Sequence, residues 1–214
     1  MLDVWFEDVV KPRMKGEAFL VRYADDFVMV FSLESDARRV VDVLPKRFGK
    51  YGLTLHPEKT RLIPFRRPDL LAGPKGRDGG TRPGTFDLLG FTHLWRRTRR
   101  GAWAIQRKTA KSRLTRALKR ITEWCRRNRH LAVSEQREAL TRKLKGHYQY
   151  YGVTWNLRML KRFRYELILI WWKWLGRRSQ RANMAWAVFQ NLLLRHPLPE
   201  AGSAHSIYRP QRNP

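Results

Sequence analysis

The chain has 214 residues and carries 45 Lys and Arg against 18 Asp and Glu, a formal net charge of +27. Its 43% hydrophobic and 12% aromatic content excludes a disordered basic tail, and its single cysteine, Cys125, excludes a disulfide framework and a cysteine-rich zinc site. A folded chain with this excess of positive charge indicates a polyanionic partner, most simply a nucleic acid.

The positive charge is concentrated in the second part of the chain. Residues 1–90 hold 16 basic and 13 acidic residues, a net charge of +3, whereas residues 91–214 hold 29 and 5, a net charge of +24. Eight of the nine Trp also follow residue 90. The shift predicts an α+β domain at 1–105, a basic helical domain at 106–195 and a proline-containing tail at 196–214.

The elements of the first part are short. Apolar runs predict strands at Ala18–Val21 and Phe27–Phe31, and the polar residues Arg22–Asp26 between them predict a hairpin turn. Ser35 is a candidate N-cap for a helix that reaches about Phe48. Further strands are predicted at Leu53–Leu55, Arg61–Phe65, Phe86–Trp95 and Ala102–Gln106. The last two flank a basic turn, Arg96–Gly101.

After residue 108 the pattern becomes helical. A first helix carries an apolar stripe of Leu114, Leu118, Ile121 and Cys125. Ser134 is a candidate N-cap for a second helix, a third runs from about Asn156 to Leu175, and a fourth from about Ser179 to Leu194. The fold class predicted from this order is α+β, with an antiparallel sheet and helices followed by a basic helical bundle.

Two adjacent carboxylates, Asp25 and Asp26, stand on the first predicted hairpin turn. Such a pair is repulsive unless a cation lies nearby, and Mg²⁺ binds through one or two carboxylates together with substrate phosphates. Two such ions roughly 3.5–4 Å apart catalyse in-line phosphoryl transfer. An Asp-rich turn that binds no metal is the alternative.

The stretch Phe19–Phe31 resembles the active-site hairpin of reverse transcriptases, most closely the reverse transcriptase–maturases of bacterial group II introns. Further blocks resemble that family in the expected order: Met1–Glu7, Leu55–Thr60, Leu89–Phe91, Ile121–Arg129, Leu144–Gly152 and the aromatic helix to Trp174. The resemblance implies a partial reverse transcriptase palm followed by a thumb/maturase domain. It covers nearly the whole chain.

The resemblance implies RNA-templated DNA synthesis with Asp25 and Asp26 as catalytic ligands of two Mg²⁺ ions. The family's third metal-binding Asp lies on an earlier palm strand; Asp3 and Asp8 match a later helical segment and take no such role. We therefore expect the carboxy-terminal half of such an enzyme, which lacks polymerase activity alone. It is a fragment, a truncated gene product or one piece of a split protein, and in the last case a missing N-terminal half is its partner. Residues implied at the nucleotide and primer are Tyr23, Ala24, Lys59, Leu89, Gly90 and Phe91.

The basic helix is the second main signal. Like charges at three- and four-residue spacing destabilise an isolated helix, so this excess of basic residues indicates contact with phosphates. Its candidate RNA-binding residues are Lys111, Arg113, Arg116, Lys119, Arg120, Arg126, Arg127 and Arg129. The implied partners are group II intron RNA, template–primer and deoxynucleotide triphosphates, in a bacterial-type cytoplasmic ribonucleoprotein with no membrane attachment. A non-catalytic maturase module that binds intron RNA is the alternative, and a generic basic RNA-binding protein is a third.

Overall fold

The computed structural model describes residues 2–58, 60–68, 83–178, 183–202 and 205. The chain divides into two units: the first comprises residues 1–89 and 97–103, and the second comprises residues 90–96 and 104–214. Among the described helices, none combines the length and apolar composition that a membrane span requires.

The first unit is built on a hairpin. Strand β1 (Ala18–Tyr23) pairs antiparallel with β2 (Asp26–Phe31), in a register that runs from Ala18 opposite Phe31 to Tyr23 opposite Asp26. Both strands were predicted. The helical elements of this unit are α1 (Leu2–Trp5), η1 (Phe6–Val10), η2 (Lys11–Arg13) and α2 (Glu34–Gly49).

Alternation along the hairpin gives it one buried and one exposed face. The buried face joins a small core made of Trp5, Phe6, Val10, Ala18, Val40 and Leu44. The other face leaves apolar side chains exposed, among them Phe19, Val21, Tyr23 and Val30. Among the described residues of the first unit, the hairpin therefore packs mainly through one side.

Helix α2 begins two residues earlier than predicted. Leu33 is its N-cap, no side chain caps it, and Ser35 lies inside the first turn. Asp36 is buried and accepts hydrogen bonds from the backbone N–H groups of Lys15 and Gly16, each at 2.9 Å. The first turn of α2 thus uses a carboxylate to fix the loop that enters β1.

The strands predicted at Leu53–Leu55 and Arg61–Phe65 are absent, because the structure describes both segments as irregular chain. In the first segment Leu53 N–H donates to the Phe48 carbonyl, and in the second the Pro64 carbonyl accepts from Gly84 N–H. A strand needs a neighbouring strand to satisfy its backbone, and an apolar run alone does not reveal whether one exists.

A second sheet has the strand order β3-β4-β5. Its strands are β3 (Phe86–Leu88), β4 (Phe91–Arg97) and β5 (Trp103–Thr109). The single strand predicted over Phe86–Trp95 is wrong, since a turn at Leu89-Gly90 divides it. Leu89 has φ +49° and Gly90 φ +78°, the paired positive values that two-residue hairpin turns require.

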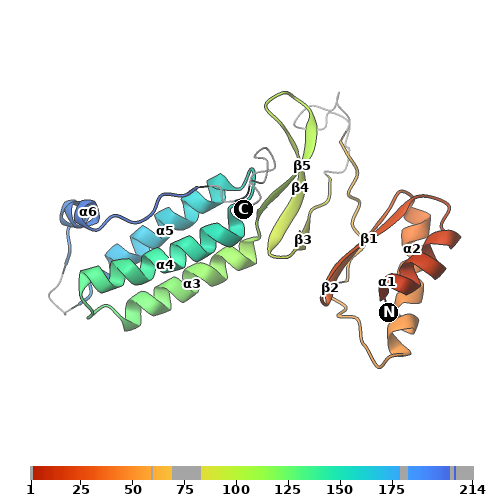
Figure 1. Ribbon diagram of the computed structural model, residues 1–214, viewed down its shortest axis with the longest axis horizontal. Helices are drawn as coiled ribbons and strands as arrows, with labels where there is room; N and C mark the ends of the chain where they lie inside the picture. Colours follow the sequence, from red (N-terminus) through yellow and green to blue (C-terminus); the bar gives the residue numbers. More distant parts are fainter. Residues whose placement is uncertain (1, 59, 69–82, 179–182, 203–204, 206–214) are drawn as a thin grey trace, which may run out of the picture. The chain divides into compact units, whose positions relative to one another are not determined.

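The second unit contains four helices among its described residues. They are α3 (Lys111–Arg127), α4 (Val133–Tyr151), α5 (Leu157–Leu175) and α6 (Trp186–Arg195). Figure 1 shows α3, α4 and α5 side by side, and α5 contacts both of the others. Their shared core includes Cys125, Leu140, Leu144, Leu160, Leu167 and Trp171.

Two of the predicted helix starts need correction. Ala132, not Ser134, is the N-cap of α4, and no side chain caps it. Helix α6 begins at Trp186; residues 183–185 are irregular, and the start predicted at Ser179 lies outside the described residues. Ser134 lies in the first turn of α4, so a residue type that favours a cap predicts a helix start only to within a turn.

The segment that follows α6 packs on the bundle. Leu198 is buried, and the Pro199 carbonyl accepts hydrogen bonds from Tyr148 Oη at 3.3 Å and Arg164 Nε at 3.1 Å. Arg164 also forms an ion pair with Glu200 at 2.7 Å. Residues 198–200, placed in the tail by the sequence, therefore contact α4 and α5.

His147 on α4 gives the second unit a pH dependence. Its ring stacks on Phe163, with centroids 3.8 Å apart, and its Nε2 is buried without a hydrogen bond among the described residues. Burial lowers the pKa of His147 to about 4, whereas the unfolded chain titrates near 6.5. The unfolded state therefore binds the extra proton between these values, and stability present above pH about 6.5 is lost as the pH falls towards 4.

We expect His147→Phe, which keeps a ring against Phe163, to lose less stability than the wild type over this pH range. Urea unfolding at a series of pH values between about 6.5 and 4 measures the difference between the two proteins. Equal losses in both would show that His147 does not contribute to the acid sensitivity.

Candidate functional site

The acidic turn lies at the end of the β1–β2 hairpin. Ala24 and Asp25 form its two-residue turn, and Asp26 is the first residue of β2. Ala24 has φ +54°, a left-handed conformation that costs a non-glycine residue roughly 1–2 kcal/mol. Both carboxylates are exposed. Strain at a turn that presents two acids is typical of functional sites.

Arg22, the nearest cation in the sequence, is engaged elsewhere. Its Nη2 lies 2.6 Å from Asp3 Oδ2, its Nε lies 2.9 Å from both Asp3 oxygens, and its Nη1 donates to the Ala24 carbonyl at 2.8 Å. The hydrogen bond from Arg22 holds the pKa of the Asp3 carboxyl below its usual value. Arg22 thus ties the turn to α1 and leaves the acidic pair without a neutralising ion pair in the described chain.

The donor set of the pair fits a hard divalent cation. Two adjacent, exposed and unneutralised carboxylates offer the oxygen ligands that Mg²⁺ prefers. The described residues contain no group of three or more His, Cys, Asp or Glu side chains placed to share a metal ion. Asp25 and Asp26 can therefore supply part of a coordination shell, which phosphate oxygens of a substrate would extend.

The other residues predicted near the nucleotide lie in different surroundings. Tyr23 is 69% exposed beside Asp26, so it is not a core aromatic. Leu89 occupies the first position of the β3–β4 turn. Lys59 lies outside the described residues.

Gly90 and Phe91 are held by the helical unit. The Gly90 carbonyl accepts a hydrogen bond from Ala110 N–H at 2.9 Å, just before α3. Phe91 is buried, with its ring 5.2 Å from that of Tyr151 and 5.9 Å from that of Tyr150. A Cβ atom added to Gly90 would lie 3.0 Å from Tyr151 Oη. The sequence did not predict this role of Tyr151.

Gly90→Ala is expected to destabilise the second unit by about 2 kcal/mol, from the left-handed backbone and from the contact with Tyr151. Gly101→Ala is the matched control, because Gly101 has φ +80° and no neighbouring atom within 4 Å of its added Cβ. Urea unfolding of both variants separates the two effects. Equal destabilisation would show that Tyr151 yields to the methyl group at no cost.

The predicted RNA-binding residues lie on α3, except Arg129, which lies two residues beyond its end. All eight predicted RNA-binding residues are exposed, whereas Leu114, Ile121 and Cys125 face the core. The spacing of three, four and seven residues aligns four of the arginines along one ridge of the helix. This ridge, called here the α3 ridge, consists of Arg113, Arg116, Arg120 and Arg127.

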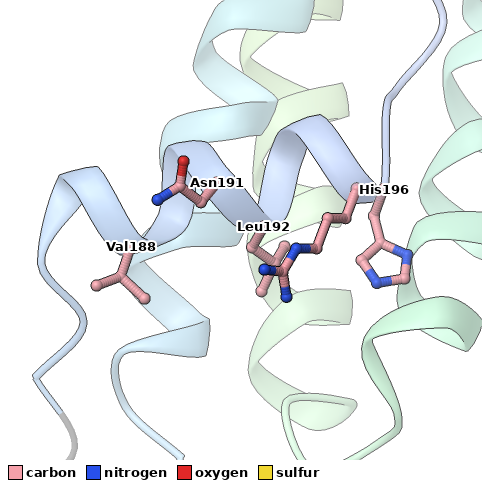
Figure 2. A pocket seen from close by; sticks show the side chains of 5 residues that line it. Val188, Asn191, Leu192 and His196 are labelled. Atoms are coloured by element: carbon pink, nitrogen blue, oxygen red, sulfur yellow. The ribbon is translucent and has the colours of Figure 1, made fainter.

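A shallow recess lies against α6 (Figure 2). It is lined by Val188, Asn191, Leu192, Arg195 and His196. Figure 2 shows that these side chains come from one helix and the residue that follows it. The recess contains no carboxylate and none of the residues predicted to bind nucleotide, primer or RNA.

A known family matches the segment of the chain that contains the acidic turn. Residues 2–93 match the family model for reverse transcriptase (RNA-dependent DNA polymerase). The match includes β1, the Ala24-Asp25 turn, β2, α2 and the Leu89-Gly90 turn, and it ends before α3. None of the curated proteins matches the chain.

Proposed function

We propose that this chain contributes the acidic palm hairpin and a nucleic-acid-binding helical unit to a group II intron reverse transcriptase–maturase, which synthesises DNA on an RNA template. One observation carries the proposal. The segment similar to reverse transcriptases presents two exposed carboxylates on a strained turn, and the neighbouring arginine is committed to Asp3 instead of to them.

In this role Asp25 and Asp26 hold Mg²⁺ through their carboxylate oxygens. Mg²⁺ held there would supply charge stabilisation for nucleotidyl transfer, and Asp25 and Asp26 would fix its position on the turn. Arg22 fixes the backbone of the turn through Asp3 and the Ala24 carbonyl. The Leu89-Gly90 turn is proposed to approach the primer strand, and the basic face of α3 to hold the template–primer backbone.

The described carboxylates are insufficient for catalysis on their own under this proposal. A two-metal centre needs further ligands beyond Asp25 and Asp26, and the described chain brings none to them. With an RNA template, a DNA primer, deoxynucleotide triphosphates and Mg²⁺, we expect no primer extension by the chain alone. Robust DNA synthesis in that assay would overturn this part of the proposal.

A non-catalytic maturase function is the second candidate. It is favoured by the net charge of +24 on residues 91–214 and by the exposed basic face of α3. In this role the chain binds group II intron RNA in a cytoplasmic ribonucleoprotein and stabilises its folded form. The Asp25→Ala, Asp26→Ala double variant would then retain full splicing support, and loss of splicing by the folded variant would contradict this role. Loss of reverse transcription in the assembled particle would favour the polymerase role.

A further inference from the structure

The turn between β4 and β5 carries a cluster of cations that none of the functions above uses. Arg97, Arg99 and Arg100, called here the arginine turn, lie within four residues, and all three are exposed. No acidic residue occurs in the sequence between Asp87 and Glu123. None of the ion pairs among the described residues involves Arg99 or Arg100.

The conformation of this turn is fixed without its arginines. Thr98 N–H donates to the Ala102 carbonyl at 2.8 Å, and Gly101 N–H donates to the Thr98 carbonyl at 3.1 Å. Gly101 supplies the positive φ of +80° that the reversal requires. These backbone bonds account for Thr98 and Gly101, and they leave the exposed cations of Arg99 and Arg100 unexplained.

The surroundings of the turn favour a phosphate backbone over a protein partner. The guanidinium of Arg97 lies over the ring of Trp103, 5.4 Å from its centroid, so the aromatic residue of the turn is covered by charge. Arginine is also enriched in protein interfaces, but it acts there beside buried aromatic and large aliphatic anchors. The exposed residues of this turn include no such anchor beside Arg99 and Arg100. Guanidinium groups instead match phosphate oxygens in charge and in planar, two-point geometry.

We propose that the arginine turn is a second RNA-binding site, at which Arg99 and Arg100 contact phosphates of a double-stranded RNA segment. Duplex RNA is recognised mainly through its shape and backbone, so a turn with projecting cations needs no base contact. The site is distinct from the basic face of α3, and it does not depend on whether the acidic turn is catalytic.

The test compares two double variants that remove the same charge from the full chain. Binding of a fluorescent RNA hairpin with a stem of about 20 base pairs is measured by anisotropy over a series of KCl concentrations. For Arg99→Gln, Arg100→Gln we expect the slope of log K against log [KCl] to become shallower by about 1.4–1.8, because two phosphate contacts are lost. Lys46→Gln, Lys50→Gln removes two exposed charges at the end of α2 and should leave the slope unchanged.

Arg99→Lys, Arg100→Lys provides a second arm, since it keeps the charge and should keep the slope within about 0.3 of the wild-type value. Circular dichroism and thermal unfolding confirm that each variant is folded. Equal slopes for the Arg99→Gln, Arg100→Gln and Lys46→Gln, Lys50→Gln proteins would overturn the proposal, as would a slope for the lysine variant as shallow as that of the glutamine variant.

Discussion

Asn156→Ala is expected to lower the free energy of unfolding of the second unit by about 3 kcal/mol. Asn156 is fully buried at the start of α5. Its Oδ1 accepts from Thr109 N–H at 2.9 Å, and its Nδ2 donates to Thr109 Oγ1 at 2.9 Å and to the Tyr151 carbonyl at 2.8 Å. One side chain thus joins the end of β5, the end of α4 and the start of α5.

The size of the effect follows from what the substitution leaves behind. Alanine removes three hydrogen bonds, and Thr109, only 1% exposed, has no access to water that could replace them. A buried polar group without a partner costs about 1–3 kcal/mol, which exceeds the net gain from an ordinary hydrogen bond. The Thr109 N–H loses its partner in this variant, and the Tyr151 carbonyl keeps only its hydrogen bond from Val153 N–H at 2.8 Å.

Urea unfolding followed by tryptophan fluorescence measures the loss, because eight of the nine Trp follow residue 90. Asn191→Ala on α6 is the control, since Asn191 is exposed and should give a change within about 0.5 kcal/mol. A urea midpoint and a slope of unfolding free energy against urea that are the same for Asn156→Ala and for the control would contradict a structural role for this network.

Neutralising three arginines of the α3 ridge is expected to weaken RNA binding by about a hundredfold near 0.1 M salt. Arg116, Arg120 and Arg127 are exposed on one side of the helix and span about 16 Å along its axis. Each phosphate contact contributes roughly 0.7–0.9 to the salt slope, so Arg116→Gln, Arg120→Gln, Arg127→Gln should make the slope shallower by about 2–3.

Two observations distinguish weaker RNA binding through lost charge from weaker binding through unfolding of α3. Arg116 and Arg120 stand four residues apart, and removing a like-charge pair at this spacing stabilises a helix slightly, so that α3 should remain intact. Glu123 occupies the position within the ridge that lacks an arginine, and Glu123→Gln should therefore strengthen RNA binding. Unchanged affinity in the triple variant, or weaker binding by Glu123→Gln, would contradict a role of this face in RNA binding.

The sequence predicted the strands and helices whose pattern of apolar residues lies within the element itself. Apolar runs predicted the two strands around Asp25 and Asp26, and the helical spacing of apolar residues predicted α3. The structure contains both elements. The exposure of the basic residues of α3 follows from the same stripe, because the helix has only one face to bury.

The remaining features depend on contacts between residues far apart in the chain. The Arg22–Asp3 pair spans 19 residues and the Asn156–Thr109 hydrogen bonds span 47, and no periodic pattern reports such partners. Residues 53–55 and 61–65 have strand-like composition and no strand to pair with among the described residues. Leu89 adopts a left-handed conformation and so forms a turn within an apolar run. Leucine rarely adopts this conformation, so its residue type does not predict the turn.

The most direct test of the metal site maps where a divalent cation binds the chain. Fe²⁺ replaces Mg²⁺ in the chain bound to an RNA template, a DNA primer and a non-hydrolysable nucleotide, whose phosphates complete the coordination shell. Ascorbate and hydrogen peroxide then generate hydroxyl radicals at the metal, which cut the neighbouring backbone. We predict cuts on both sides of Asp25 that excess Mg²⁺ suppresses and that Asp25→Asn, Asp26→Asn abolishes while RNA binding is retained. Cuts that persist in this double variant would contradict the assignment of Asp25 and Asp26 as metal ligands.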